Sequence, residues 1–347
     1  MKIKVTLPLF ALLITVIVSS TQAQPAGKKF TLDGIVNTGN DRLIYIEYAY
    51  RKEEYRTDSA AIEHGHFHFN GPVEGPTAAF LTTDKKLLPD DDKPINSATG
   101  KNTVLFFLEP AAMQVTLDTA DFRYATFSGS HAQEEFTAFS KQAKTQDALS
   151  EFMGRYPGSY VSAWLLTWHH FPLDTLRHYY YAFPGKLQHS AYGKAILKDI
   201  QRKELVAVGK RAPSFDQQDR NGKSISLKDF RGNYVLLQFW ASWNTASKME
   251  NEQLLQAYNR YKNKNFTIIG ASIDGQKTRG LWSAAVAGGK LPWIQLMALK
   301  TAHNPVALKY DVETIPANFL IDPAGRIIAN DLNGEGLQKK LALIFSN

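Results

Sequence analysis

The sequence predicts an α+β multidomain protein with an N-terminal antiparallel β-sandwich or barrel, a helical linker and a C-terminal mixed α/β domain. Three observations support this prediction. Short alternating runs with turn residues between them fill residues 24–130, a helical apolar period fills residues 131–208, and strands alternate with helices over residues 209–347. With 347 residues, of which 44% are hydrophobic, the chain is long enough for more than one core.

The first region shows the pattern of short strands. Its apolar runs include residues 30–32, 43–48, 67–69 and 104–108, and turn residues such as Asn70-Gly71 separate them. Strands of this length and spacing are typical of a small antiparallel sandwich or barrel.

The second region changes to a helical period. Tyr160, Trp164 and Trp168 recur at four-residue steps, and prolines followed by glycines at 157–158 and 184–185 interrupt the pattern. Several consecutive helices are therefore expected between residues 131 and 208.

The third region alternates strands with helices before it closes in a hairpin. Expected strands cover 234–240, 266–273, 293–297, 318–321 and 326–329; expected helices cover 245–262, 277–286, 305–310 and 335–345. This order predicts a sheet with parallel and antiparallel strands covered by helices.

The N-terminus has the features of a secretory signal peptide. Lys2 and Lys4 precede an apolar run over residues 5–18, and Thr21-Gln22-Ala23 supplies small residues for cleavage. We therefore expect residues 1–23 to be removed and the protein to be exported to the periplasm or cell envelope. No later segment is apolar enough to be expected to span a membrane.

Charge and cysteine content exclude several classes of function. The formal net charge is +7, but the basic residues are scattered, and a nucleic-acid site would need them clustered in a stripe. The chain has no cysteine, which excludes disulfides, thiolate metal sites and thiol nucleophiles. The sequence predicts no cofactor.

Several motifs in the third region carry a resemblance to a known family. Residues 209–215 (GKRAPSF), 227–233 (LKDFRGN), 235–243 (VLLQFWASW) and 310–325 (YDVETIPANFLIDPAG) resemble, in this order, the secreted thioredoxin-like proteins of the TlpA and ResA type. The resemblance covers residues 209–347 and implies a thioredoxin fold. Residues 28–205 more loosely resemble an uncharacterised β-rich domain and helical linker that often precede such domains.

The resemblance implies a redox motif, W-C-x-x-C, whose first thiol lies at a helix N-terminus. The corresponding residues here are Trp243-Asn244-Thr245-Ala246-Ser247, so Asn244 and Ser247 replace both cysteines. Gln238 stands where many thioredoxins have a buried carboxylate, and glutamine does not titrate. Thiol–disulfide chemistry by this chain alone is therefore excluded, and no residue is expected to be catalytic. Asn244 can instead serve as the N-cap of the following helix.

The same resemblance points to a peptide-binding groove. In the family the bond before the proline that corresponds to Pro316 is cis, and the loop around it pairs with a bound peptide. Thr314, Ile315 and Pro316 are present in this sequence, as is Trp243. These four residues predict a groove that works without a thiol; alternatively, Pro316 serves only the turn.

Histidines at positions 64, 66 and 68 form a separate candidate site. In a strand, His64, His66 and His68 would all point to one face, where histidines can bind zinc or copper. The alternative is a solvent-facing polar row opposite Phe67 and Phe69, and no metal is expected in that case.

Three functional hypotheses remain open. The first is a non-catalytic binding or scaffold protein whose partner is an extended peptide or an envelope protein. The second is an accessory to thiol–disulfide exchange that acts with a cysteine-bearing partner, and the third is a metal-binding module that uses the histidines.

Overall fold

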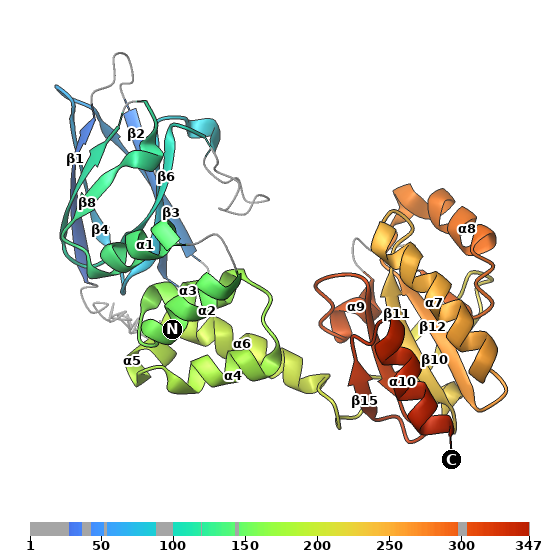
Figure 1. Cartoon of the computed structure of the whole chain (residues 1–347). Coiled ribbons are helices and arrows are strands. Elements are labelled where there is room, and N and C mark those ends of the chain that lie inside the picture. Colours follow the sequence, from blue (N-terminus) through green and yellow to red (C-terminus); the bar gives the residue numbers. More distant parts are fainter. Residues whose placement is uncertain are drawn as a thin grey trace, which may run out of the picture. The chain divides into compact units, whose positions relative to one another are not determined.

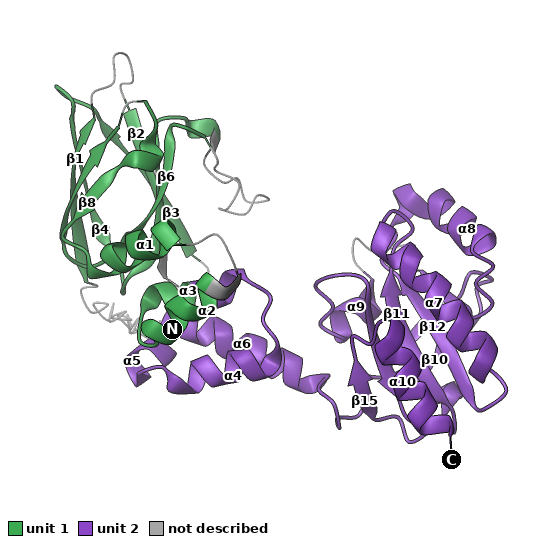
Figure 2. Cartoon of the chain, viewed as in Figure 1, with its two compact units in different colours: residues 1–164 green, residues 165–347 purple. Residues whose placement is uncertain are grey.

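The computed structural model describes residues 28–36, 43–51, 54–87, 100–118, 120–142, 146–297 and 304–346. The chain divides into two compact units, residues 1–164 and 165–347 (Figure 2). Each unit contains hydrophobic core of its own. The predicted signal peptide, residues 1–23, lies outside the described residues.

The first unit contains two four-stranded sheets (Figure 1). One has the order β4 (His66–Pro72), β1 (Lys29–Val36), β7 (Ala112–Leu117) and β8 (Thr126–Ser128). The other has the order β3 (Glu54–Ala61), β2 (Leu43–Arg51), β5 (Thr77–Thr82) and β6 (Thr103–Leu108). Both sheets contribute side chains to one core, as Leu32, Ile46 and Phe106 show by their complete burial.

The β-rich architecture of this unit agrees with the sequence prediction, with one difference in strand direction. β1 pairs with β4 antiparallel but with β7 in parallel. Parallel neighbours need a long crossover connection, and here the chain from β2 to β6 supplies the connection between β1 and β7.

Helices follow the second sheet: α1 (His131–Gln142), α2 (Gln146–Arg155) and α3 (Tyr160–Trp168). Phe136 of α1 and Trp164 of α3 both contact Phe107 of β6, with ring centroids 5.3 and 5.5 Å apart. Gln133 reinforces this contact because its Oε1 accepts a hydrogen bond from the backbone N–H of Phe107 at 2.6 Å. Two short 3₁₀ helices, η1 (Lys85–Leu87) and η3 (Phe122–Tyr124), lie between the strands.

The second unit begins within α3 and continues through α4 (Leu173–Ala182), α5 (Gly185–Gln188) and α6 (Ala191–Leu205). The region that we expected to form a helical linker, residues 131–208, is thus helical and is shared between the two units. None of the helices in the described part of the chain has the length and apolar character needed to cross a membrane.

The rest of the second unit is a five-stranded mixed sheet with flanking helices. The strand order is β13 (Ile294–Met297), β12 (Phe266–Ser272), β11 (Tyr234–Trp240), β14 (Ala317–Ile321) and β15 (Ile327–Asn330). The first three strands are parallel, whereas β14 runs antiparallel to both of its neighbours. The helices are α7 (Thr245–Tyr261), α8 (Arg279–Gly288), α9 (Pro305–Lys309) and α10 (Gly334–Phe345); β9 (Asp216–Gln218) and β10 (Ser224–Ser226) form a hairpin, and η4 (Leu227–Phe230) and η5 (Gln276–Thr278) are short 3₁₀ helices.

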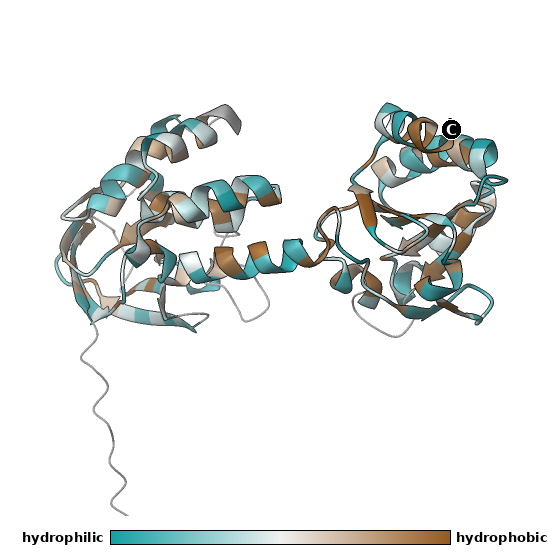
Figure 3. Cartoon of the chain, turned by 90° about the horizontal axis from the view of Figure 1, so that it is seen from below, coloured by the Kyte–Doolittle hydropathy of each residue, from teal (hydrophilic) through white to brown (hydrophobic). Residues whose placement is uncertain are grey.

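Side chains of β11 alternate between two cores. Leu237 and Phe239 pack with α9 and β10, whereas Leu236 and Trp240 pack with α7, α8 and α10. Because both faces are covered, the strand reads as a nearly continuous apolar run, and Figure 3 shows hydrophobic residues along the strands of this sheet. Gln238 is the polar exception, on the face covered by α7.

Candidate functional site

The register of β11 and β14 brings the two segments of the predicted groove, Trp243 and residues 314–316, to the same edge of the sheet. Phe239 of β11 pairs with Ala317 of β14 in antiparallel register. The chain therefore leaves β11 toward Trp243 at the same edge where it enters β14 from Pro316. Trp243 is 53% exposed, and the Ile315–Pro316 peptide bond is cis.

Asn244 forms the N-cap of α7. Its backbone is extended, with φ −91° and ψ 118°, and its Oδ1 accepts a hydrogen bond from the backbone N–H of Ser247 at 2.8 Å. This geometry confirms the predicted capping role, because an N-cap side chain satisfies one of the free N–H groups of the first helical turn.

Ser247 is buried completely. Its side chain has no exposed surface, and within the described residues its Oγ has no hydrogen-bond partner. Its hydroxyl is thus held away from solvent at the helix start and is not presented to a substrate.

A carboxyl group lies next to Gln238, although Gln238 itself is neutral. The Nε2 of Gln238 donates to Glu250 Oε2 at 3.2 Å and to Asn251 Oδ1 at 2.9 Å, and Asn318 Nδ2 donates to Glu250 Oε1 at 2.9 Å. Burial raises the pKa of Glu250, and the hydrogen bonds from Gln238 and Asn318 counteract only part of this effect.

Sequence reasoning missed Glu250. A signal was present, because Glu250 follows Ser247 by three residues on α7 and therefore lies on the same buried helix face. Asn244, Ser247 and Gln238 are neutral, as the sequence indicates, and the buried acid of this site comes from helix α7 and not from strand β11.

A second buried carboxylate fixes the segment after β11. Asp274, 2% exposed, accepts hydrogen bonds from the backbone N–H and the Oγ of Ser242 at 2.8 and 2.7 Å, and from Ser272 Oγ at 2.7 Å. These bonds fix the position of Ser242, and therefore the point at which the chain enters the exposed Trp243.

The loop before Pro316 has unpaired backbone groups. Among the described residues, no backbone–backbone hydrogen bond involves Glu313, Thr314 or Ile315. Glu313 and Thr314 are exposed, and Ile315 is half-buried against the core. Solvent-accessible N–H and C=O groups of this kind are available to an added strand.

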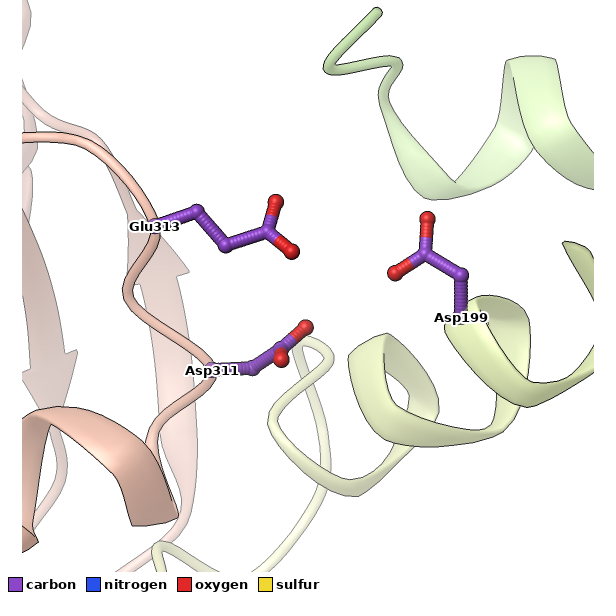
Figure 4. A group of neighbouring side chains, drawn as sticks. All are labelled: Asp199, Asp311 and Glu313. Carbon is purple, nitrogen blue, oxygen red and sulfur yellow. The ribbon is translucent and has the colours of Figure 1, made fainter. Parts of the chain in front are cut away.

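Three carboxylates near this loop converge, as Figure 4 shows for Asp199 of α6, Asp311 and Glu313. Cations already lie among them: Arg202 is 3.0 Å from Asp311 and 3.1 Å from Glu313, and Lys203 is 3.6 Å from Glu313. The cluster is therefore an ion-pair network that links α6 to the loop.

His170 also belongs to this network, since its Nδ1 lies 2.8 Å from Glu313 Oε2. Burial acts to raise the pKa of Glu313, but Lys203, His170 and Arg202 together lower it. Burial raises the pKa of Asp311 although Arg202 and Lys203 act to lower it. The network anchors the chain directly before Thr314.

The three histidines do not share one strand face. His64 lies in the turn before β4, with φ 53°, whereas His66 and His68 are exposed on the strand itself. His68 Nδ1 pairs with Asp33 Oδ1 at 2.7 Å. Placing His64 in the strand was wrong, because the glycine at position 65 continues a tight turn there. Among the described residues these histidines form no group of three converging ligand atoms.

Comparisons with known proteins agree with the fold. Residues 208–330 match the AhpC/TSA family, and residues 30–136 match a domain of unknown function, DUF4369. The thiol-disulfide oxidoreductase ResA of Bacillus cereus is 32% identical over 150 residues, which cover 41% of this chain and 79% of that protein. The chain belongs to the ResA-related thioredoxin-like family.

Other relatives of this ResA-related chain carry similar names. ResA of Bacillus subtilis is 29% identical over 126 residues, covering 36% of this chain and 68% of that protein. Among solved structures, the thioredoxin domain of a thiol-disulfide oxidoreductase from Bacteroides vulgatus is 35% identical, with 40% of this chain and 97% of that domain covered and a TM-score of 0.38. The ResA-related chain described here has no cysteine.

Proposed function

We propose that this protein is an exported, non-catalytic member of its family that binds an extended peptide segment of another protein. The proposed groove runs along Thr314, Ile315 and Pro316, beside Trp243. The observation that carries the proposal is the unpaired backbone of residues 313–315, which offers hydrogen bonds to an added strand.

Two further features support a binding role. Trp243 exposes about half of its surface at the same sheet edge, and half-exposed tryptophans are frequent anchors of protein interfaces. The segments on both sides are held in place, by Asp274 before Trp243 and by the ion pairs of Arg202 before Thr314. A groove with fixed walls binds at a lower entropic cost than a mobile one.

Binding is tested with reduced and carboxymethylated α-lactalbumin, an unfolded chain without free thiols. We expect the protein to bind it, and we expect Trp243→Ala to weaken binding about tenfold, the usual effect of removing an anchor side chain. Tyr124→Ala, which removes another exposed aromatic ring, serves as the control and should change nothing.

Hydrogen exchange locates the contact. On binding, the amides of Thr314 and Ile315 should become protected, because a paired strand covers them. Absence of binding, or equal binding by the Trp243 and Tyr124 variants without protection of these amides, would contradict the proposal.

A further inference from the structure

A second concave site lies between α7 and α8 and contains none of the proposed peptide-groove residues. It has a volume of about 470 Å³, within the range of small-molecule sites. Each helix presents residues spaced by three and four positions, which lie on one helix face. These residues are Lys248, Asn251, Glu252 and Leu255 on α7, and Leu281, Ala284, Ala285 and Gly288 on α8.

Small residues keep this groove open. Ala284, Ala285 and Gly288 stand where larger side chains would bridge the two helices, and a Cβ atom added at Gly288 would meet nothing within 4 Å. Trp240, Leu255 and Leu291 give the groove apolar walls, and Leu281 exposes 58% of its surface at the rim. The groove is thus suited to binding an apolar chain.

One end of the groove is polar. Asn251, only 7% exposed, uses its Oδ1 to accept from Gln238, and no described residue accepts a hydrogen bond from its Nδ2. An amide donor on the wall of a cavity that has no partner among the described residues is suited to an acceptor supplied by a ligand.

One cation, Lys248, and one acid line the groove, and two further cations lie at the start of α8. Lys248 lies on the rim one turn before Asn251, and within the described part of the chain no acidic side chain forms an ion pair with it. Exposed Lys277 precedes α8, and exposed Arg279 is its first residue. The N-terminus of α8 adds partial positive charge. The acid that lines the groove is Glu252. An anionic head group therefore matches this end.

We propose that the groove between α7 and α8 binds an apolar carboxylate, with the acyl chain along Leu255, Leu281 and Ala284 and the carboxylate between Lys248 and Asn251. The apolar walls supply affinity through burial of the chain. The unused amide donor and the lysine supply orientation and the preference for an anion.

The probe is decanoate, titrated below its micelle concentration into the full chain and followed by isothermal calorimetry. Decyltrimethylammonium, which has the same chain and the opposite charge, serves as the comparison ligand. We expect saturable binding of decanoate at one site and binding at least about tenfold weaker for the cation. No decanoate binding up to millimolar concentration, or equal binding of both ligands, would overturn the proposal.

Variants place the site. Ala284→Leu fills the groove and should weaken decanoate binding at least about tenfold, whereas Ala287→Leu, the same change at an exposed position of α8 outside the groove, should not. Gly288→Leu is the second filling variant, because its Cβ meets no neighbour, so that the test survives if one variant fails to fold. Unchanged binding in a folded filling variant would refute the location.

Charge variants test the head-group contact. Lys248→Gln should weaken decanoate binding about fivefold and strengthen binding of the cation, because a repelling positive charge is removed. Lys262→Gln, on an exposed lysine past the end of α7, should affect neither ligand. Equal effects of these two substitutions would refute the role of Lys248.

Discussion

The Oδ1 of Asn244 accepts a hydrogen bond from the backbone N–H of Ser247 at 2.8 Å, so a helix cap joins the two positions where the sequence resemblance predicts the redox cysteines. A cysteine at the first position would offer only a weak sulfur acceptor to the same N–H group. These two positions thus contribute to the helix cap, and neither carries a thiol.

Removing the cap should destabilise α7. We expect Asn244→Ala to lower the free energy of unfolding by about 1 kcal/mol, the usual cost of losing an N-cap side chain. Asn244→Asp keeps the acceptor and adds a negative charge at the helix N-terminus, so its stability should equal or exceed that of the wild type. Urea denaturation of the three proteins measures the difference, and an unchanged midpoint for the alanine variant would show that the cap is unimportant.

Restoring both thiols should restore redox chemistry. In the Asn244→Cys/Ser247→Cys protein, the first thiol lies at the N-terminus of α7, where the helix dipole lowers a thiol pKa and favours the thiolate. We expect turnover in an insulin-reduction assay with dithiothreitol, and none for the wild type, which has no cysteine.

The single variant Asn244→Cys is the control, because it can attack a disulfide but has no second thiol to resolve the mixed disulfide. A folded double variant with two titratable thiols and no turnover would show that the site has lost more than its cysteines.

The fold could be predicted wherever burial leaves a local pattern. The run over residues 234–240 and the helix from Thr245 coincide with β11 and α7, because apolar period and capping both appear in the sequence. β3 (Glu54–Ala61) was missed, since its side chains are mostly exposed and show no alternation. A strand of this kind is specified by pairing with β2 and not by its own residues.

The candidate site was predictable only in part, for a related reason. Asn244 was assigned correctly because capping is a local interaction. Glu250 looked like any acidic residue on a helix, because its burial depends on Asn318, which lies 68 positions further along the chain. Contacts of that separation leave no trace in local periodicity.

A buried acid in the first unit should make stability depend on pH. Burial raises the pKa of Glu47, which is 3% exposed, to about 7, and a hydrogen bond from Thr57 offsets little of this. The folded state therefore binds this proton more tightly than the unfolded state, where a glutamate titrates near 4.3. The resulting stabilisation is complete below that pH and is lost as the pH rises through about 7.

Glu47→Gln removes this ionisation. At pH 8 we expect the variant to be more stable than the wild type by about 3 kcal/mol, and at pH 4 the two should be similar. Glu74→Gln, at an exposed position of the same unit, should not change the profile. Thermal denaturation across this pH range provides the measurement, and parallel profiles for wild type and Glu47→Gln would contradict the assignment.

Glu250 should produce a pH dependence of the same sign in the second unit. Its pKa is raised by burial, so the folded state again holds the proton more tightly, and stability should fall as the pH rises above the usual glutamate value of about 4.3. In Glu250→Gln this fall should be reduced. The glutamine amide introduced at position 250 can donate its N–H to Oε1 of Gln238 if the amide group of Gln238 turns, because this oxygen has no partner in the described residues. The amide oxygen at position 250 can still accept a hydrogen bond from Asn318.

The matched control is Glu252→Gln, on an exposed position of the same helix, which should leave the pH profile of unfolding unchanged. Urea denaturation at pH 5 and pH 8, followed by tryptophan fluorescence, gives the stability difference for each protein. We expect this difference to be smaller in Glu250→Gln than in both the wild type and Glu252→Gln. If Glu250→Gln lowers stability equally at both pH values, the carboxyl acts through packing and its ionisation has no part in stability.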